Sequence, residues 1–146
     1  MFNTFKNKEI INNEKHDLCT PVGFPSPARD YRENSLDLNN LMIANPQSTY
    51  FVRVEGYSMK NANIYPEDIL VVDRSLPIVN NQIVVAILDG EFVVKRLKIK
   101  DNIYWLCPEN DEYQAVRIEE WMDFSVWGVV TWVIQKKYLC SSAPYS

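Results

Sequence analysis

Six short runs of β-branched and aromatic residues constrain the fold of this chain more than any other feature of its sequence. Gly, Pro, Asn and Asp, which favour turns, separate the runs from one another. The runs begin at Thr49 and read TYFVRVE, ILVVD, IVVAIL, EFVVKRL, IYWLC and FSVWGVVTWVI. This spacing predicts a mostly β body of antiparallel strands.

One pair of runs predicts its own connection. Asp89 and Gly90 lie between IVVAIL and EFVVKRL. Both residues tolerate the positive φ angles of a tight type I′ turn, which joins adjacent antiparallel strands. We therefore expect these two runs to form a β-hairpin.

The first 34 residues have a different character. They are rich in Asn, Lys and Glu, contain three prolines (Pro21, Pro25 and Pro27), and show neither helical nor strand periodicity. We interpret residues 1–34 as an extended arm, residues 35–138 as one compact domain, and residues 139–146 as a polar, loose tail.

A short helix is expected at the start of the domain, in residues 35–45. Leu38, Leu41 and Met42 recur at helical spacing, so they form one apolar face that is expected to dock on the β body. Ser35 is a candidate N-cap, and Pro46 follows the expected end of the helix.

Composition excludes several classes of protein. The chain has 146 residues, of which 47% are hydrophobic and 23% charged, which suits one globular domain. A net charge of -4 disfavours binding to the negatively charged phosphates of nucleic acids, so direct nucleic-acid binding is not expected. The start is too polar for a signal peptide, and the longest uncharged run, residues 124–135, is too short to span a membrane. We expect a cytoplasmic protein.

Few residues suit a metal or cofactor site. The three cysteines, Cys19, Cys107 and Cys140, form no C-x-x-C pair, and the four glycines form no phosphate loop. No metal or cofactor is therefore expected. His16, the only histidine, lies in the polar arm, where an ordinary solvated role is expected, so a Ser-His-Asp triad is disfavoured.

Lys95 is a candidate general base. Strand alternation places Val93, Lys95, Leu97 and Ile99 on one face, and three basic residues, Arg96, Lys98 and Lys100, on the other. A lysine on an apolar face loses hydration, which lowers its pKa and makes a neutral amine available. The alternative is a long side chain that lies along the edge of the core with its charged end in water.

Ser58 is a candidate nucleophile. It lies in the sequence Gly56-Tyr57-Ser58-Met59, directly after the predicted strand TYFVRVE. Gly56 permits a sharp turn that would expose the hydroxyl at the end of the strand. The alternative is a turn serine that hydrogen-bonds its own backbone.

Taken together, these motifs resemble the LexA and UmuD family of self-cleaving peptidases. The likeness runs from about Gly23 to Lys137 through GFPSPARDY, LDLNNLMI, STYFVRVEGYSM, ILVVDRS, DGEFVVKRL and SVWGVV. The 37 positions between Ser58 and Lys95 also agree with the family pattern. The match to UmuD covers nearly the whole chain, and the likeness to LexA is confined to its self-cleaving domain.

The resemblance implies a Ser-Lys dyad that cuts the chain's own arm. Ser58 would be the nucleophile, Lys95 the general base, and the bond between Val22 and Gly23 the cleavage site. It also implies three partners: a second copy of the chain in a homodimer, the RecA filament on single-stranded DNA that stimulates cleavage during the SOS response, and a UmuC-type polymerase for error-prone translesion synthesis.

Three residues depart from the family pattern. Val22 replaces the usual Cys or Ala before the scissile bond, and its β-branched side chain could slow attack. Tyr57 replaces an acidic residue, and Glu67 replaces a glycine. The rival hypothesis is a UmuD-like interaction module that keeps the dyad but is not cleaved at Val22, and regulates the polymerase intact. A LexA-like repressor would need a helix-turn-helix, for which the arm is too short and irregular.

Overall fold

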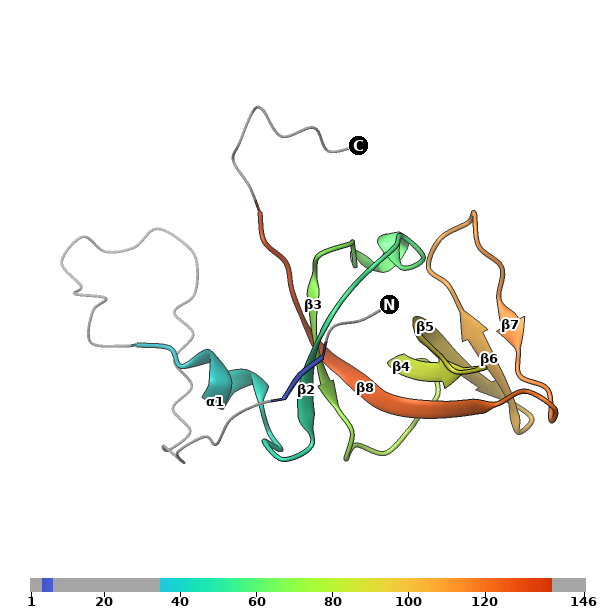
Figure 1. The fold of residues 1–146 in the computed structure, drawn as a ribbon, viewed down its shortest axis with the longest axis horizontal. Coiled ribbons are helices and arrows are strands. Elements are labelled where there is room, and N and C mark those ends of the chain that lie inside the picture. The colour runs from blue at the N-terminus through green and yellow to red at the C-terminus, as the bar shows by residue number, and fades with distance from the viewer. Residues whose placement is uncertain (1–3, 7–34, 138–146) are drawn as a thin grey trace.

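The computed structural model describes residues 4–6 and 35–137, and the account below is confined to them. Eight strands form one antiparallel sheet in the order β1-β2-β3-β8-β4-β5-β6-β7. The strands are β1 (Thr4–Lys6), β2 (Thr49–Arg53), β3 (Ile69–Asp73), β4 (Ile83–Leu88), β5 (Glu91–Lys100), β6 (Ile103–Cys107), β7 (Val116–Arg117) and β8 (Phe124–Ile134). The mostly β fold expected from the sequence is confirmed (Figure 1).

Each predicted run contains one strand. The strands β3, β4, β6 and β8 have the bounds of their runs, whereas β5 continues to Lys100. The two strands that were not predicted, β1 and β7, have three and two residues, too few for alternation to show. The strand β1 also lies in the arm, where no periodicity was found, and pairs antiparallel with β2.

The predicted hairpin is confirmed. The strands β4 and β5 pair antiparallel, and Leu88 opposite Glu91 closes the ladder. Asp89 and Gly90 occupy the turn with φ angles of 49° and 82°, in the left-handed region that a type I′ turn requires. This hairpin carries Lys95 on its second strand.

The long strand β8 joins the two halves of the sheet. Its C-terminal part pairs with β3 and its N-terminal part with β4. Two register shifts, near Thr131 and near Trp127, leave one extra residue each on β8. Such bulges bend a strand and increase its twist. Figure 1 shows β8 running from β3 to the group of β4 to β7.

Two hydrophobic clusters fill the interior. The first is built from β2, β3, the turn after β2, and one residue each of β4 and β5; its buried members are Val52, Val54, Met59, Ile64, Leu70, Val72, Val85 and Val94. The second lies among β4, β5 and β6 and contains Val84, Ala86, Leu97 and Leu106. Alternating residues of β4 and β5 enter different clusters, so both faces of this hairpin are apolar.

The expected short helix is present, but its details were predicted wrongly. The helix α1 covers only Leu38–Met42, and its N-cap is Asp37, not Ser35. The Asp37 carboxylate accepts a hydrogen bond of 2.9 Å from the Asn39 N–H, which satisfies one of the open donors of the first turn. The helix ends because Ile43 adopts an extended conformation and is buried.

The apolar face of α1 does not dock on the body as expected. No residue of the helix is buried, and Leu38 and Leu41 are 55% and 41% exposed. The loop after the helix makes the contact instead. Asn45 Nδ2 and Ser48 Oγ donate hydrogen bonds of 2.8 and 2.9 Å to the buried carboxylate of Asp73, at the end of β3.

Gly128 provides a test of the β8 packing. A Cβ atom at this position would lie 2.5 Å from Val72 Cγ1 and 3.2 Å from Arg74 Cγ. We expect Gly128→Ala to lower the free energy of unfolding by about 1–3 kcal/mol, since overpacking forces neighbours to move. Urea unfolding would measure the loss, with Ser125→Ala at an exposed position of the same strand as the control. A Gly128→Ala protein as stable as the control would contradict this packing.

Candidate active site

Ser58 lies in a turn that follows β2. Gly56 has a φ angle of 83°, in the left-handed region that glycine adopts readily, and so permits the sharp turn expected from the sequence. The next residue after the serine, Met59, is only 2% exposed and belongs to the first hydrophobic cluster. A 3-10 helix, η2 (Lys60–Ala62), continues the chain. Burial of Met59 thus fixes the turn against the core and leaves Ser58 half-buried at its surface.

Lys95 lies on β5, opposite Val84 of β4. Val84 and Leu97 are fully buried, and Val93 and Ile99 pack against the same cluster. Lys98 and Lys100, on the other face of β5, are exposed. Strand alternation therefore places Lys95 on the face that contacts the second cluster, with Val93, Leu97 and Ile99, in agreement with the sequence analysis.

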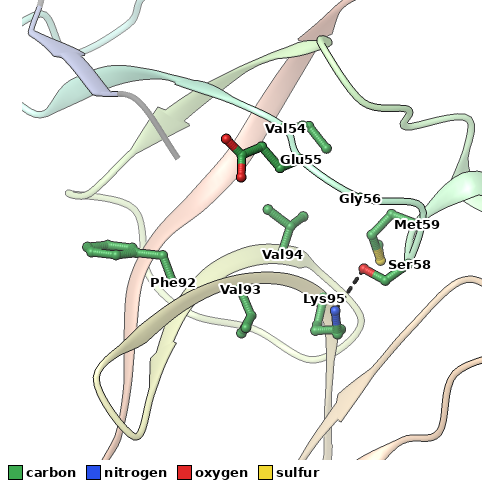
Figure 2. A pocket seen from close by; sticks show the side chains of 9 residues that line it. All are labelled: Val54, Glu55, Gly56, Ser58, Met59, Phe92, Val93, Val94 and Lys95. Atoms are coloured by element: carbon green, nitrogen blue, oxygen red, sulfur yellow. Dashed lines mark hydrogen bonds between the residues drawn. The ribbon is translucent and has the colours of Figure 1, made fainter. Parts of the chain in front are cut away.

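The two side chains meet at one end of a small pocket (Figure 2). Lys95 Nζ donates a hydrogen bond of 2.8 Å to Ser58 Oγ. Figure 2 shows Phe92 at the other end of the pocket. The pocket has a volume of about 100 Å³, and its lining residues are Val54, Glu55, Gly56, Ser58, Met59, Phe92, Val93, Val94 and Lys95.

Burial lowers the pKa of Lys95 below the ordinary lysine value of 10.5. The cause is desolvation, since apolar neighbours replace the water that would stabilise an ammonium ion. A neutral amine at 2.8 Å from a hydroxyl can accept its proton, which converts the hydroxyl into a nucleophile. The arrangement is therefore chemically suited to acyl transfer without a histidine.

The sequence analysis missed a second element of the site. The loop after β6, residues 108–110, contacts the Ser58 turn through both backbone and side chain. Glu109 N–H donates a hydrogen bond of 2.8 Å to the Ser58 carbonyl, and Asn110 Nδ2 donates one of 2.8 Å to the Tyr57 carbonyl. Neither periodicity nor a motif singled out Asn110, because loop residues carry no regular pattern.

The remaining predicted site residues lie outside the described part of the chain. These are Val22 and Gly23; His16, Cys19 and Cys140, for which no site role was predicted, also lie outside it. Cys107 is a free thiol. Among residues 4–6 and 35–137, no group of His, Cys, Asp and Glu side chains is arranged to hold a metal ion. The same residues include no helix that is long and apolar enough to cross a membrane.

Comparison with known proteins identifies the family. Residues 17–131, most of the chain, match the Peptidase S24-like family. The chain belongs to this family. It is 46% identical over 116 residues to Protein SamA of Salmonella typhimurium, a match that covers 80% of each chain. It is 40% identical over 120 residues to Protein MucA of Escherichia coli, covering 82% of each.

A more distant relative is the LexA repressor of Ectopseudomonas mendocina. It is 36% identical over 116 residues, which are 79% of this chain and 56% of the repressor. The resemblance to the LexA and UmuD family is thereby confirmed, and the chain is a UmuD-like S24 protein related to the SOS response. Family membership supports a self-cleaving peptidase of the LexA and UmuD type.

The two departures from the family pattern that lie in the described residues leave the site intact. Glu67 has a φ angle of 73°, so it keeps a left-handed conformation where glycine is typical. Its carboxylate accepts a hydrogen bond of 3.1 Å from Arg53 Nη1 on β2. The side chain of Tyr57 is 47% exposed, and its carbonyl faces the loop of residues 108–110. Neither residue separates Ser58 from Lys95.

The lowered pKa of Lys95 predicts a pH dependence of stability. The unfolded chain binds more protons than the folded one between the folded pKa and 10.5, so the free energy of unfolding should rise with pH there. Urea unfolding from pH 7 to 10 should show this rise. Lys95→Met should remove the contribution of Lys95 to the pH dependence. The Lys95 ¹³Cε resonance should titrate below pH 10.5; a midpoint at or above that value would contradict the desolvation.

Proposed function

We propose that Ser58 and Lys95 form a catalytic dyad that cuts the chain's own arm between Val22 and Gly23. The observation that carries this proposal is the hydrogen bond of 2.8 Å between Lys95 Nζ and Ser58 Oγ, together with the desolvation of the amine. Both groups line the same pocket. Membership in the S24 family supports the same activity.

The proposed reaction begins with acylation of the serine. Neutral Lys95 takes the proton of Ser58 Oγ, and the oxygen attacks the carbonyl carbon of Val22. The bond between this carbon and the Gly23 nitrogen breaks, and the lysine ammonium gives its proton to the departing amine. Backbone N–H groups near Ser58 are suited to bind the oxyanion, a contribution worth roughly 3 kcal/mol for each donor.

Hydrolysis then restores the enzyme. Lys95 takes a proton from a water molecule, which attacks the ester between Val22 and Ser58. The C–O bond to Ser58 Oγ breaks, the oxygen regains a proton from Lys95, and residues 1–22 leave with a carboxyl group at Val22. Atoms and charges balance without a metal or an external cofactor.

The segment between the proposed cleavage site and the domain has a long reach when extended. Twelve positions separate Gly23 from Ser35, and an extended chain of this length spans about 40 Å. Gly23 suits the position after the scissile bond, since the missing side chain allows close approach of its backbone to the nucleophile. An arm tethered in this way makes cleavage first order, and docking of the arm offers a point of control.

Family membership also supports a proposal for the cellular role. We propose that the RecA filament on single-stranded DNA favours docking of the arm, in the cytoplasm, after DNA damage. The trimmed chain, covering residues 23–146, then acts as a homodimer and accessory subunit of a UmuC-type polymerase in translesion synthesis. The domain of residues 35–138 would hold both the dyad and the dimer contact.

Self-cleavage can be tested on the purified full-length chain. At alkaline pH the fraction of neutral Lys95 rises, so a fragment that begins at Gly23 should accumulate faster as pH increases. Ser58→Ala and Lys95→Ala should each abolish the fragment, whereas Lys98→Ala, on the exposed face of the same strand, should cleave normally. Mass spectrometry of timed samples identifies the new terminus.

Two results would contradict the proposed function. Equal cleavage in wild type and Ser58→Ala would assign the fragment to a contaminating protease. No fragment, even with RecA filaments formed on single-stranded DNA, would favour the uncleaved interaction module.

Val22 provides a separate test of the cleavage site. Its β-branched side chain is stiff and bulky next to the attacked carbonyl, so Val22→Ala should cleave faster, by about three- to tenfold. That increase corresponds to roughly 0.6–1.4 kcal/mol of the barrier. First-order rate constants of the two chains measure it, with Val22→Ala/Ser58→Ala as the inactive control. An unchanged rate in Val22→Ala would contradict this cleavage site, and a slower rate would contradict the steric effect of Val22.

A further inference from the structure

The loop of residues 108–110, here named the brace loop, holds the Ser58 turn at three points. Glu109 N–H donates a hydrogen bond of 2.8 Å to the carbonyl of Ser58 itself. The Glu109 carbonyl accepts one of 2.7 Å from the Asn61 N–H. Asn110 Nδ2 donates one of 2.8 Å to the Tyr57 carbonyl. The brace loop is about 50 positions from the turn in sequence, yet it binds the backbone on both sides of the nucleophile.

The side chain of Asn110 is itself fixed in orientation. It is only 4% exposed, and its Oδ1 accepts a hydrogen bond of 2.9 Å from the Glu112 N–H. With the oxygen bound to Glu112, the amide nitrogen must face Tyr57. A buried polar side chain with both ends bound has a single low-energy orientation, since any rotation would leave a donor or an acceptor unsatisfied.

Because the peptide between Tyr57 and Ser58 is planar, the hydrogen bond from Asn110 to the Tyr57 carbonyl also fixes the direction of the Ser58 N–H. In a trans peptide the carbonyl and the following N–H point in opposite directions. The Tyr57 carbonyl faces Asn110 and also accepts a hydrogen bond of 3.2 Å from the Lys60 N–H. The Ser58 N–H therefore points away from the brace loop. The brace loop contributes no residue to the pocket, which Ser58 lines.

We infer that Asn110 is a positioning residue that aims the Ser58 N–H as a donor to the oxyanion formed during cleavage. This inference rests on the proposed dyad, since an oxyanion forms only if Ser58 attacks a carbonyl. Asn110 acts through the Tyr57–Ser58 peptide and does not contact the reacting atoms itself. The Ser58 N–H makes that contact. A rigid, preorganised donor is more effective in a partly dry site than a mobile one.

The brace loop also connects the turn to the strand that carries Lys95. Arg96, the next residue along β5, forms an ion pair through Nε with the Glu109 carboxylate. Its Nη1 donates a hydrogen bond of 2.8 Å to the Asn81 carbonyl, in the turn before β4. The backbone of Glu109 thus binds Ser58, and the side chain of Glu109 binds Arg96, the neighbour of Lys95. This arrangement links the two segments that carry the members of the dyad.

The test compares two asparagines in the full-length chain. Asn110→Ala and Asn45→Ala each remove one Nδ2 hydrogen bond of 2.8 Å, but Asn45 binds Asp73, which does not line the pocket. Rate constants for fragment formation are measured from pH 7 to 11 together with melting temperatures. We expect Asn110→Ala to lower the alkaline plateau about tenfold to a hundredfold and to leave the pH midpoint in place. Asn45→Ala should cleave at the wild-type rate.

A second variant guards against loss of the fold. Asn110→Asp keeps an oxygen that can accept from the Glu112 N–H but replaces the donor that faces Tyr57, and it should slow cleavage in the same way. Cleavage of either Asn110 variant within twofold of wild type would overturn this inference alone. An equal rate loss in Asn45→Ala would assign the effect to general destabilisation and also overturn it. Absence of cleavage in the wild type would overturn the proposed function and this inference together.

Discussion

The properties of this site depend on the partial burial of the Lys95 amine next to the Ser58 hydroxyl. Lys95 shares its strand face with Val93 and Leu97, and desolvation there lowers its pKa. The distance of 2.8 Å between Lys95 Nζ and Ser58 Oγ places the neutral amine within reach of the hydroxyl proton. A salt-bridged carboxylate beside Lys95 would favour the ammonium and remove this capacity. The apolar surroundings are therefore part of the chemistry.

The sheet provides these surroundings because both faces of the β4–β5 hairpin are covered. Val94 and Val85 enter the first cluster, and Leu97 and Val84 enter the second. The strand β8 makes this possible, since it pairs with β3 along one part and with β4 along another, and its bulges bend it between them. The turn that carries Ser58 is fixed to the first cluster by Met59. Core packing thus brings two distant segments to one pocket.

Much of this fold could be predicted from local pattern. Six strands and the Asp89-Gly90 hairpin followed from alternation and turn chemistry, which act over a few residues. The helix α1 was predicted less well. Its N-cap is Asp37 instead of Ser35, and Leu38 and Leu41 are exposed. The contact with the body is made by Asn45 and Ser48, which bind Asp73, and helical spacing alone does not reveal such a long-range contact. The short strand β7 shows the same limit, since its pairing depends on β6.

The sequence by itself determined the mostly β class, the inward face of Lys95 and the turn at Gly56, because strand period and glycine conformation are local properties. Only the tertiary structure decided that Ser58 Oγ lies 2.8 Å from Lys95 Nζ. It also decided that Asn110 binds the Tyr57 carbonyl. Both contacts join segments tens of residues apart, and their geometry depends on how the sheet bends and the cores fill. No local pattern contains that information.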